Sequence, residues 1–339
     1  MKPVLLIAYK FPPYSMVGAY RWTKLSRKLA EIGHEVHVVT VDWKSMGHNA
    51  HWLNEVDHPN IHIYRIPSGN PLHFWVQTKP LNRITSKIRK LLFSLVNFFF
   101  FFDDEAQRWG THLIPYCEQL IQEQKITTII ATGHPFQSNR FAGDLKERFP
   151  HLQLIQDLRD PWIEDNGKKL NTRHYDRVLD WEKRALKAAD DVVSVSPTLL
   201  KSFEKYETSA RFHWIPNGVD QQPEESFLKY NKGIHICYAG NIFCGREEPL
   251  MRLLMLIQSQ KADFSQLKIT IIGGIHYSIK KTFQPLIDSG CLELIPHQAQ
   301  EAVYMAIKKS HFALHLNAKR CPGALSTKIY EYAALKVPV

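Results

Sequence analysis

The sequence predicts an α/β protein built from two doubly wound, Rossmann-like domains. Apolar runs typical of parallel strands buried on both faces alternate with amphipathic helices along the chain. The length of 339 residues exceeds what one hydrophobic core usually supports, and a hydrophobic content of 44% is enough for two. A turn-rich, polar connector interrupts the alternation beyond the middle of the chain. We therefore expect two parallel sheets, each with its ligand edge at the carboxyl ends of the strands.

The N-terminus contains the first strand, loop, helix and strand. Val4 to Ala8 is a continuous apolar run, and a loop with two prolines and Gly18 follows it. A helix is expected from Ala19 to Gly33, where Trp22, Leu25, Leu29 and Ile32 share one face and Arg21, Lys24, Arg27 and Lys28 form the solvated one. Glu35 to Val41 then reads as the second strand, which completes a βαβ unit.

The same alternation continues through the rest of the first domain. Strands are expected at 126–131, 152–156 and 192–196, and helices at 141–148 and 175–189. The connector consists of Trp214 to Asp220 and the polar run Gln221 to Lys232. We place the domain boundary there, with residues 1–215 in the first domain and 216–339 in the second.

The second domain repeats the architecture, with strands expected at 234–239, 268–272, 292–295 and 312–316 and a helix at 250–257. A last short helix begins near Ser326 and Thr327, either of which can cap it, and its free N–H groups would face an anion such as phosphate. The alternative is a purely structural amphipathic helix. Val337 to Val339 looks like the start of another strand, so we expect the second domain to be truncated at the C-terminus.

Charge and cysteine content narrow the class of protein. The formal net charge of +10 favours phosphate-bearing partners, which include nucleic acid, an anionic membrane and nucleotide ligands. The five cysteines (Cys117, Cys237, Cys244, Cys291 and Cys321) form no CxxC motif and are odd in number, which argues against a disulfide framework and a thiolate zinc site. A cytoplasmic protein is expected, because the N-terminal apolar run resembles a strand rather than a signal peptide.

One segment, Lys87 to Phe102, differs from its surroundings. Basic residues precede a run rich in leucine and phenylalanine that is shorter than the roughly 20 residues needed to span a bilayer. Such a segment suits a helix lying at an anionic membrane surface. An insertion packed on the first domain is an equally good interpretation.

Chemically useful residues gather after the predicted strands. They are Gly18, His134, the segment Asp157 to Trp162 with Asp157 and Asp160, the pair Gly240 and Asn241 with Arg246, and Lys328 with Glu331. Three of them also have a structural interpretation: Gly18 as a loop glycine, His134 as a residue at a helix entry, and Asp157 to Asp160 as a self-paired surface turn. Their shared position after strands favours a ligand site.

Four sequence motifs resemble those of glycosyltransferase family 4, a family of retaining enzymes with the GT-B fold. They are Phe11-Pro12-Pro13 with Gly18, Gly33-His34-Glu35-Val36, Ile215 to Asp220, and Lys328 to Tyr332 with Val337-Pro338-Val339. Together with Asp157 to Trp162, they look like the bacterial branch that builds surface polysaccharides. The resemblance implies two domains facing a cleft, an acceptor-side first domain and a nucleotide-sugar-binding second domain.

The resemblance also implies an activity and residue roles. A sugar would pass from a UDP- or GDP-linked donor to a glycan or lipid-linked acceptor, with its configuration retained and with no essential metal or cofactor. Arg246 and Lys328 would neutralise the diphosphate, Gly18, Gly240 and Asn241 would line the donor site, and Glu331 would bind the ribose. His134 would contact the donor sugar, Asp157 and Asp160 would orient the acceptor, and Arg159 could pair with an anionic part of it.

The sequence departs from the family pattern at two positions. Gly323 stands where the family has a first glutamate, and Asn241 stands where an arginine is common, although Lys319 and Arg320 could compensate for the missing cation. A catalytically impaired GT-B-like binding or scaffold protein is therefore the alternative. A nucleic-acid-binding protein is disfavoured because no aromatic-interleaved basic motif is present, and a dinucleotide oxidoreductase because no GxGxxG follows the first strand.

Overall fold

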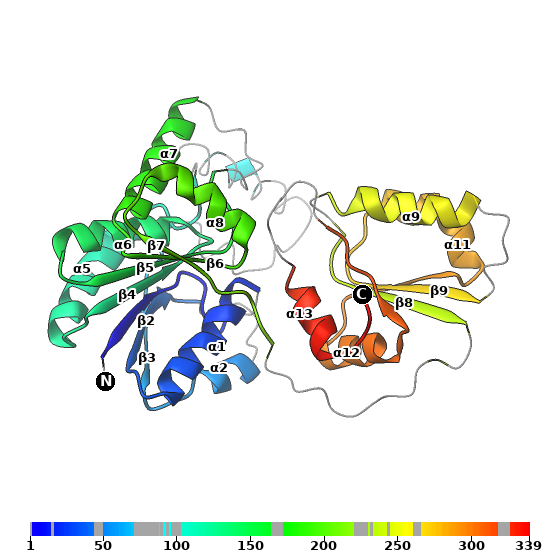
Figure 1. Ribbon diagram of the computed structural model, residues 1–339, viewed down its shortest axis with the longest axis horizontal. Coiled ribbons are helices and arrows are strands. Elements are labelled where there is room, and N and C mark those ends of the chain that lie inside the picture. The colour runs from blue at the N-terminus through cyan, green and yellow to red at the C-terminus, as the bar shows by residue number, and fades with distance from the viewer. Residues whose placement is uncertain are drawn as a thin grey trace. The chain divides into compact units, whose positions relative to one another are not determined.

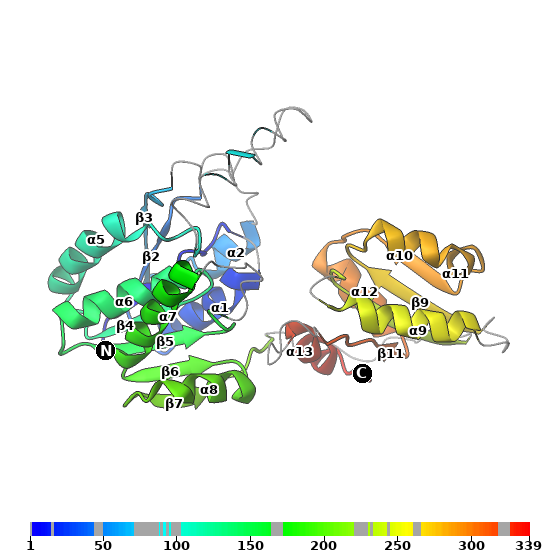
Figure 2. The same cartoon turned by 90° about the horizontal axis from the view of Figure 1, so that it is seen from above.

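The computed structural model describes two compact units, Met1–Pro216 and Asn217–Val339. The division lies one residue beyond the expected boundary. Within them the described residues are 2–14, 17–43, 50–70, 88, 91–92, 95, 103–163, 172–219, 230, 233–242, 245–259, 266–317 and 326–339. Each unit is a parallel sheet with helices packed on it (Figure 1, Figure 2).

The sheet of the first unit has seven parallel strands in the order β3-β2-β1-β4-β5-β6-β7. Their bounds are β1 Val4–Ile7, β2 Val36–Val41, β3 Ile61–Ile66, β4 Thr128–Thr132, β5 Gln153–Leu158, β6 Asp191–Ser194 and β7 Arg211–Trp214. The chain moves outward from β1 to β3 and then returns to place β4 beside β1. In open α/β sheets such a reversal leaves a crevice at the carboxyl ends of the two central strands.

Helices cover both faces of this sheet (Figure 1). They are α1 Val17–Glu31, α2 Ala50–Glu55, α5 Gly110–Glu123, α6 Gln137–Arg148, α7 Thr172–Lys187 and α8 Pro197–Phe203, followed by a short 3-10 helix at Glu204–Tyr206. Alternate residues of β1 serve the two cores: Leu5 and Ile7 pack in the cluster that includes α5 and α6, and Leu6 packs with Trp22 of α1. The continuous apolar run of β1 is therefore needed on both sides.

Sequence analysis did not predict β3, β7, α2, α5 or α8 in the first unit. β7 has the sequence Arg-Phe-His-Trp and lies at the edge of the sheet, largely exposed. An edge strand does not need a continuous apolar run, so its residues resembled part of the connector. α5 contains Pro115, which obscured its helical pattern.

The second unit has a four-stranded parallel sheet in the order β10-β9-β8-β11. Its strands are β8 Ile234–Ala239, β9 Leu267–Ile272, β10 Leu292–Ile295 and β11 Phe312–Ala313, and its helices are α9 Glu247–Ser259, α10 Tyr277–Thr282, α11 Gln284–Asp288, α12 Gln300–Lys309 and α13 Thr327–Ala334. The strand expected at 312–316 is thus shorter than predicted. Past α13, the carbonyl of Pro338 accepts a hydrogen bond from the Ala313 N–H (2.7 Å), so residues 337–339 lie beside β11 without forming a strand.

Two further sequence features can be placed. Cys117, Cys237 and Cys291 are buried free thiols, while Cys244 and Cys321 lie outside the described residues. Within the described part of the chain, no helix is both long and apolar enough to cross a bilayer.

Candidate functional site

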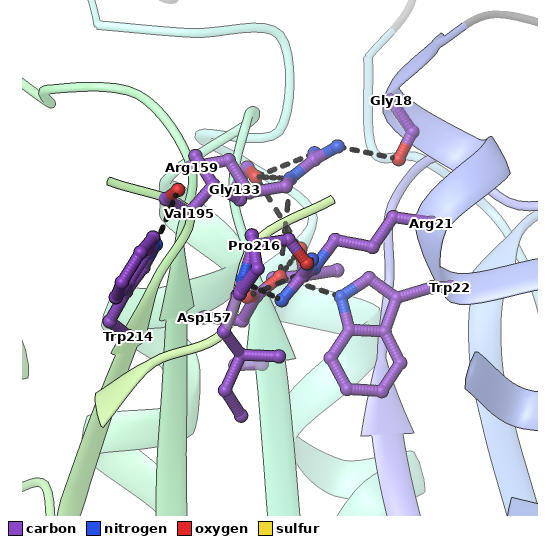
Figure 3. A network of polar contacts seen from close by, with 12 residues as sticks. Gly18, Arg21, Trp22, Gly133, Asp157, Arg159, Val195, Trp214 and Pro216 are labelled. Atoms are coloured by element: carbon purple, nitrogen blue, oxygen red, sulfur yellow. Dashed lines mark hydrogen bonds and ion pairs between the residues drawn. The ribbon is translucent and has the colours of Figure 1, made fainter. Parts of the chain in front are cut away.

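The carboxyl ends of β1, β4 and β5 meet around the buried carboxylate of Asp157 (Figure 3). Only 1% of Asp157 is exposed. Its Oδ2 accepts hydrogen bonds from Trp22 Nε1 (2.7 Å) and Thr132 Oγ1 (2.9 Å), and Arg21 Nε lies 3.5 Å from Oδ1. A buried charge is tolerated only with such partners. Asp157 therefore joins α1, β4 and β5 at this edge of the sheet.

Arg159, just past β5, connects two backbone segments at the same edge. Its Nε and Nη2 donate to the carbonyl of Gly133 (2.9 and 2.6 Å), and its Nη1 donates to the carbonyl of Gly18 (3.0 Å) (Figure 3). The planar guanidinium can serve both because its donors point in fixed directions. Arg159 thereby fixes the start of α1 relative to the loop after β4.

Arg21 extends this network to the end of the first unit. Its Nη1 and Nη2 donate to the carbonyls of Pro216 (2.9 Å) and Ile215 (3.0 Å). The expectation that Arg21 lies on the solvated face of α1 is therefore wrong. Arg21 is only 8% exposed, because the chain that leaves β7 crosses over it. Helical periodicity identifies the side of a helix but not which distant backbone covers that side.

His134 lies in the loop between β4 and α6 and is half-buried. Its Nδ1 is 3.4 Å from the ammonium of Lys10, which lies three residues past the end of β1. Beneath this loop, the buried Asn139 side chain donates to the carbonyl of Ala131 (3.1 Å) and to Gln156 Oε1 (2.7 Å). The backbone that carries His134 is thus supported from below.

The structure brings Gly18, His134 and Asp157 to one edge of the first sheet, as their places in the sequence suggested. The self-paired surface turn considered for Asp157, Arg159 and Asp160 is wrong for Asp157, which is buried. Arg159 contacts backbone carbonyls rather than solvent alone, and Asp160 is partly exposed. Sequence reasoning missed Lys10, although a cation just past the first strand could have been singled out.

In the second unit, Gly240 and Lys328 are in close contact at the carboxyl end of β8. Gly240 has φ +133°, and a Cβ at this position would lie 2.5 Å from Lys328 Nζ. Glycine is therefore favoured by the backbone conformation, and a side chain here would also push the end of Lys328 aside. The Lys328 ammonium is 5.8 Å from the centre of the Tyr238 ring.

Three charged residues influence one another here. Burial lowers the pKa of Lys328, the positive charge of Arg246 lowers it further, and Glu331 opposes both effects. Burial likewise raises the pKa of Glu331, which Lys328 partly offsets. Ser326 caps α13 as expected, with its side chain accepting from the Lys328 N–H (3.4 Å). The charged side chains of Lys328 and Glu331 are thus partly desolvated. They lie near the N-terminus of α13, where the helix dipole would stabilise a bound anion.

Asn241 connects two loops at the same edge. Its Oδ1 accepts a hydrogen bond from the Gly274 N–H (2.9 Å), and its carbonyl accepts one from Tyr238 Oη (3.2 Å). An open pocket of about 780 Å³ adjoins it, and its lining includes Gly245, Glu247 and His276. The pocket lies where β8 and β9 end, the edge at which α/β sheets bind ligands.

Some predicted features cannot be placed. Gly323, Lys319 and Arg320 lie outside the described residues. Across the part of the chain that the structure describes, no three His, Cys, Asp or Glu side chains are grouped as a metal site would require.

Each of the two units is a parallel sheet with candidate ligand-binding residues at the carboxyl ends of its strands. This is the architecture of GT-B glycosyltransferases. The chain belongs to glycosyltransferase family 4, because the model of that family, Glycosyltransferase Family 4, matches residues 19–222. The protein is accordingly a glycosyltransferase of the GT-B type. No curated protein matches the sequence.

Solved structures show the same fold at low sequence identity. The apo form of the lipopolysaccharide outer core galactosyltransferase WaaB has a TM-score of 0.61 at 13% identity, covering 100% of this chain and 79% of that one. TarM has a TM-score of 0.61 at 10% identity, covering 100% and 84%. WaaG, a glycosyltransferase involved in lipopolysaccharide biosynthesis, has a TM-score of 0.57 at 13% identity, covering 99% and 80%. At these identities the likeness establishes the fold.

Proposed function

We propose that this enzyme is a retaining, metal-independent hexosyltransferase of bacterial surface-polysaccharide synthesis. It would move a sugar from a UDP- or GDP-linked donor to a glycan or lipid-linked acceptor, without a further cofactor. Membership of family 4 supports the reaction class. The similar folds of WaaB and WaaG, whose names refer to lipopolysaccharide, support the type of acceptor.

The observation that carries the proposal is the cluster of Lys328, Arg246 and Glu331 beside Gly240. Burial and a neighbouring cation both lower the pKa of Lys328, so its charged form gains when an anion arrives. The Ser326-capped start of α13 adds backbone N–H groups. A diphosphate matches this combination of two cations and the N-terminal end of a helix.

The reaction follows from these charges. As the bond between sugar and phosphate breaks, negative charge grows on the diphosphate, and Lys328, Arg246 and the N–H groups stabilise it. Glu331 accepts hydrogen bonds from the ribose hydroxyls, and Asn241 holds the adjoining loop in place. The departing phosphate takes the acceptor's proton, so this proposal requires no separate protein base.

The first unit contributes the remaining groups. Gly18 lets an anionic group approach the backbone, and His134 contacts the donor sugar. Asp160, partly exposed, orients the acceptor. Asp157 does not contact the substrate in this proposal. Its buried carboxylate accepts hydrogen bonds from Trp22 and Thr132 and so stabilises the edge of the sheet that carries the other residues.

We further propose that the enzyme works in the cytoplasm at the inner face of the membrane, through Lys87 to Phe102. Most of this segment lies outside the described residues. The four described positions, Ile88, Leu91, Leu92 and Leu95, are helical and between 38% and 62% exposed. Their spacing puts them on one helical face, which suits insertion into a lipid surface. Flotation with anionic vesicles should carry the wild type but not Leu91→Glu/Leu92→Glu, and equal flotation of both would contradict the proposal.

A donor panel tests the activity. Thermal melts with UDP- and GDP-sugars should identify one that stabilises the protein, since a ligand at 100 times its dissociation constant adds about 2.7 kcal/mol. Lys328→Met should abolish that stabilisation. Lys309→Met is the control, because Lys309 is exposed at the end of α12, where the chain enters β11 at the opposite edge of the sheet. If no donor binds the wild type, or if Lys328→Met binds equally well, the proposal fails.

A further inference from the structure

Lys10 is held between a carboxylate and the imidazole of His134. Its Nζ lies 2.8 Å from Glu105 Oε1 and 3.4 Å from His134 Nδ1. Nζ is also 5.7 Å from the centre of the Tyr14 ring, and 16% of the lysine side chain is exposed. A lysine confined in this way has lost most of the rotamer freedom of a surface lysine.

The backbone on both sides of this contact is anchored. The carbonyl of Tyr9 accepts hydrogen bonds from Trp43 Nε1 (3.0 Å) and Thr40 Oγ1 (3.2 Å), and Tyr9 Oη donates to the carbonyl of Glu105 (3.3 Å). Lys10 and Glu105 are thus brought together by fixed main-chain positions. On the other side, Arg159 holds the carbonyl of Gly133, directly before His134.

The chemistry of the two groups decides where the imidazole proton lies. An ammonium has three N–H donors and no acceptor, so His134 Nδ1 must be the acceptor in this contact. A ring with a lone pair on Nδ1 carries its proton on Nε2. The doubly protonated ring has no lone pair to offer, so the contact opposes that form too. Glu105 supports the arrangement, because its ion pair with Lys10 keeps the ammonium beside the ring.

We propose that Lys10 is a positioning residue that holds His134 as the neutral Nε2–H tautomer. The ring then presents an N–H donor, rather than a basic nitrogen, to a hydroxyl of the donor sugar. This inference rests on the proposed contact between His134 and that sugar. It agrees with a reaction in which the departing phosphate, and not histidine, takes the acceptor's proton.

Nitrogen NMR of the free protein tests the tautomer directly. The chain has 17 histidines, so the His134 signals are assigned in ¹⁵N-histidine-labelled protein by their loss in His134→Gln. At mildly alkaline pH, wild-type Nδ1 should resonate as an unprotonated nitrogen and Nε2 as a protonated one. In Lys10→Met both signals should move toward each other as the tautomers mix. A protonated Nδ1 in the wild type would overturn the inference without any variant.

Kinetics test the consequence for catalysis. Lys10→Met and Glu105→Gln should each lower kcat about tenfold, the worth of one neutral hydrogen bond, with the donor KM changed less than twofold. Lys10→Arg should recover part of the loss, because it restores a donor. Lys28→Met is the control, since Lys28 is an exposed lysine of α1 paired with Glu31. Glu105→Gln provides the test should Lys10→Met fail to fold.

The failures of the two proposals are distinguishable. If His134→Gln keeps full activity, the proposed contact with the sugar is wrong, whatever the tautomer. If His134→Gln is impaired but Lys10→Met leaves both the NMR signals and kcat unchanged, the positioning role of Lys10 is wrong and the proposed function stands.

Discussion

Replacing Gly18 with alanine should affect the stability of the fold and the affinity for the donor in opposite directions. Gly18 lies in the first turn of α1, and its φ is outside the left-handed region. A Cβ there would lie 3.7 Å from Lys10 Cδ and 3.8 Å from Arg159 Nη2, which are ordinary van der Waals contacts. The protein therefore has room for the methyl group. Because glycine in a helix costs about 0.5–1 kcal/mol relative to alanine, Gly18→Ala should be neutral or stabilising by up to that amount.

Donor binding should respond in the opposite direction. If an anionic group approaches the backbone at Gly18, the methyl group would push it away and weaken a charge-assisted hydrogen bond. Such bonds contribute roughly 1.5–3 kcal/mol, which corresponds to about 10- to 150-fold in the dissociation constant. Calorimetric titration of the nucleotide sugar measures the affinity, and a thermal melt of the same sample measures the stability.

Gly143→Ala is the matched control. Gly143 is in α6, away from the carboxyl edge, and a Cβ there would be 3.5 Å from Ala185 Cα. It should fold and bind the donor as the wild type does. A Gly18→Ala protein that folds well and keeps its donor affinity would refute ligand approach at this position. One that loses more than about 1 kcal/mol of stability would refute the packing argument.

Three further outcomes are expected. Gly240→Ala should destabilise the protein by about 1–3 kcal/mol in urea, because its backbone has a positive φ. It should also weaken donor binding, because the Cβ would displace Lys328 Nζ; full affinity would contradict this. Donor affinity should fall as the pH drops through the raised pKa of Glu331, and it should fall again as the pH rises toward the lowered pKa of Lys328. Binding titrations at a series of pH values measure both losses, and Glu331→Gln should remove the one at acid pH. Asp157→Asn should cost about 3–5 kcal/mol in chemical denaturation, because it leaves Arg21 beside a buried neutral group; a loss below 1 kcal/mol would show that the network is dispensable.

Sequence analysis placed several strands to within one residue, including the edge strand β10. β1, β2 and β8 have apolar runs that no other element of that length would need, and their observed bounds differ from the predicted ones by one residue or less. β7 was missed because an edge strand can be polar and exposed. Apolar runs therefore identify strands that are at least partly packed, such as β10, and fail for an exposed polar strand such as β7.

The candidate site was predictable in its location but not in its contacts. Gly18 and His134 follow strands that the topology makes neighbours, so their convergence follows from the order β1-β4. The burial of Arg21 depends on where residues 215 and 216 run, nearly 200 positions later in the sequence, and no local pattern carries that information. The Lys10 contact depends on Glu105 in the same way.

The two units use their cations differently, and this difference favours the second unit as the place where the proposed diphosphate would bind. In the first unit, the guanidinium groups of Arg21 and Arg159 donate to backbone carbonyls, so they hold the chain together. In the second unit, the pKa of Lys328 is lowered by burial and by Arg246, which means that its charge is under-compensated. An incoming anion would favour the charged form of Lys328, whereas at Arg21 and Arg159 it would have to displace existing hydrogen bonds. Free nucleoside diphosphate should therefore depend on Lys328 for binding far more than on Arg159.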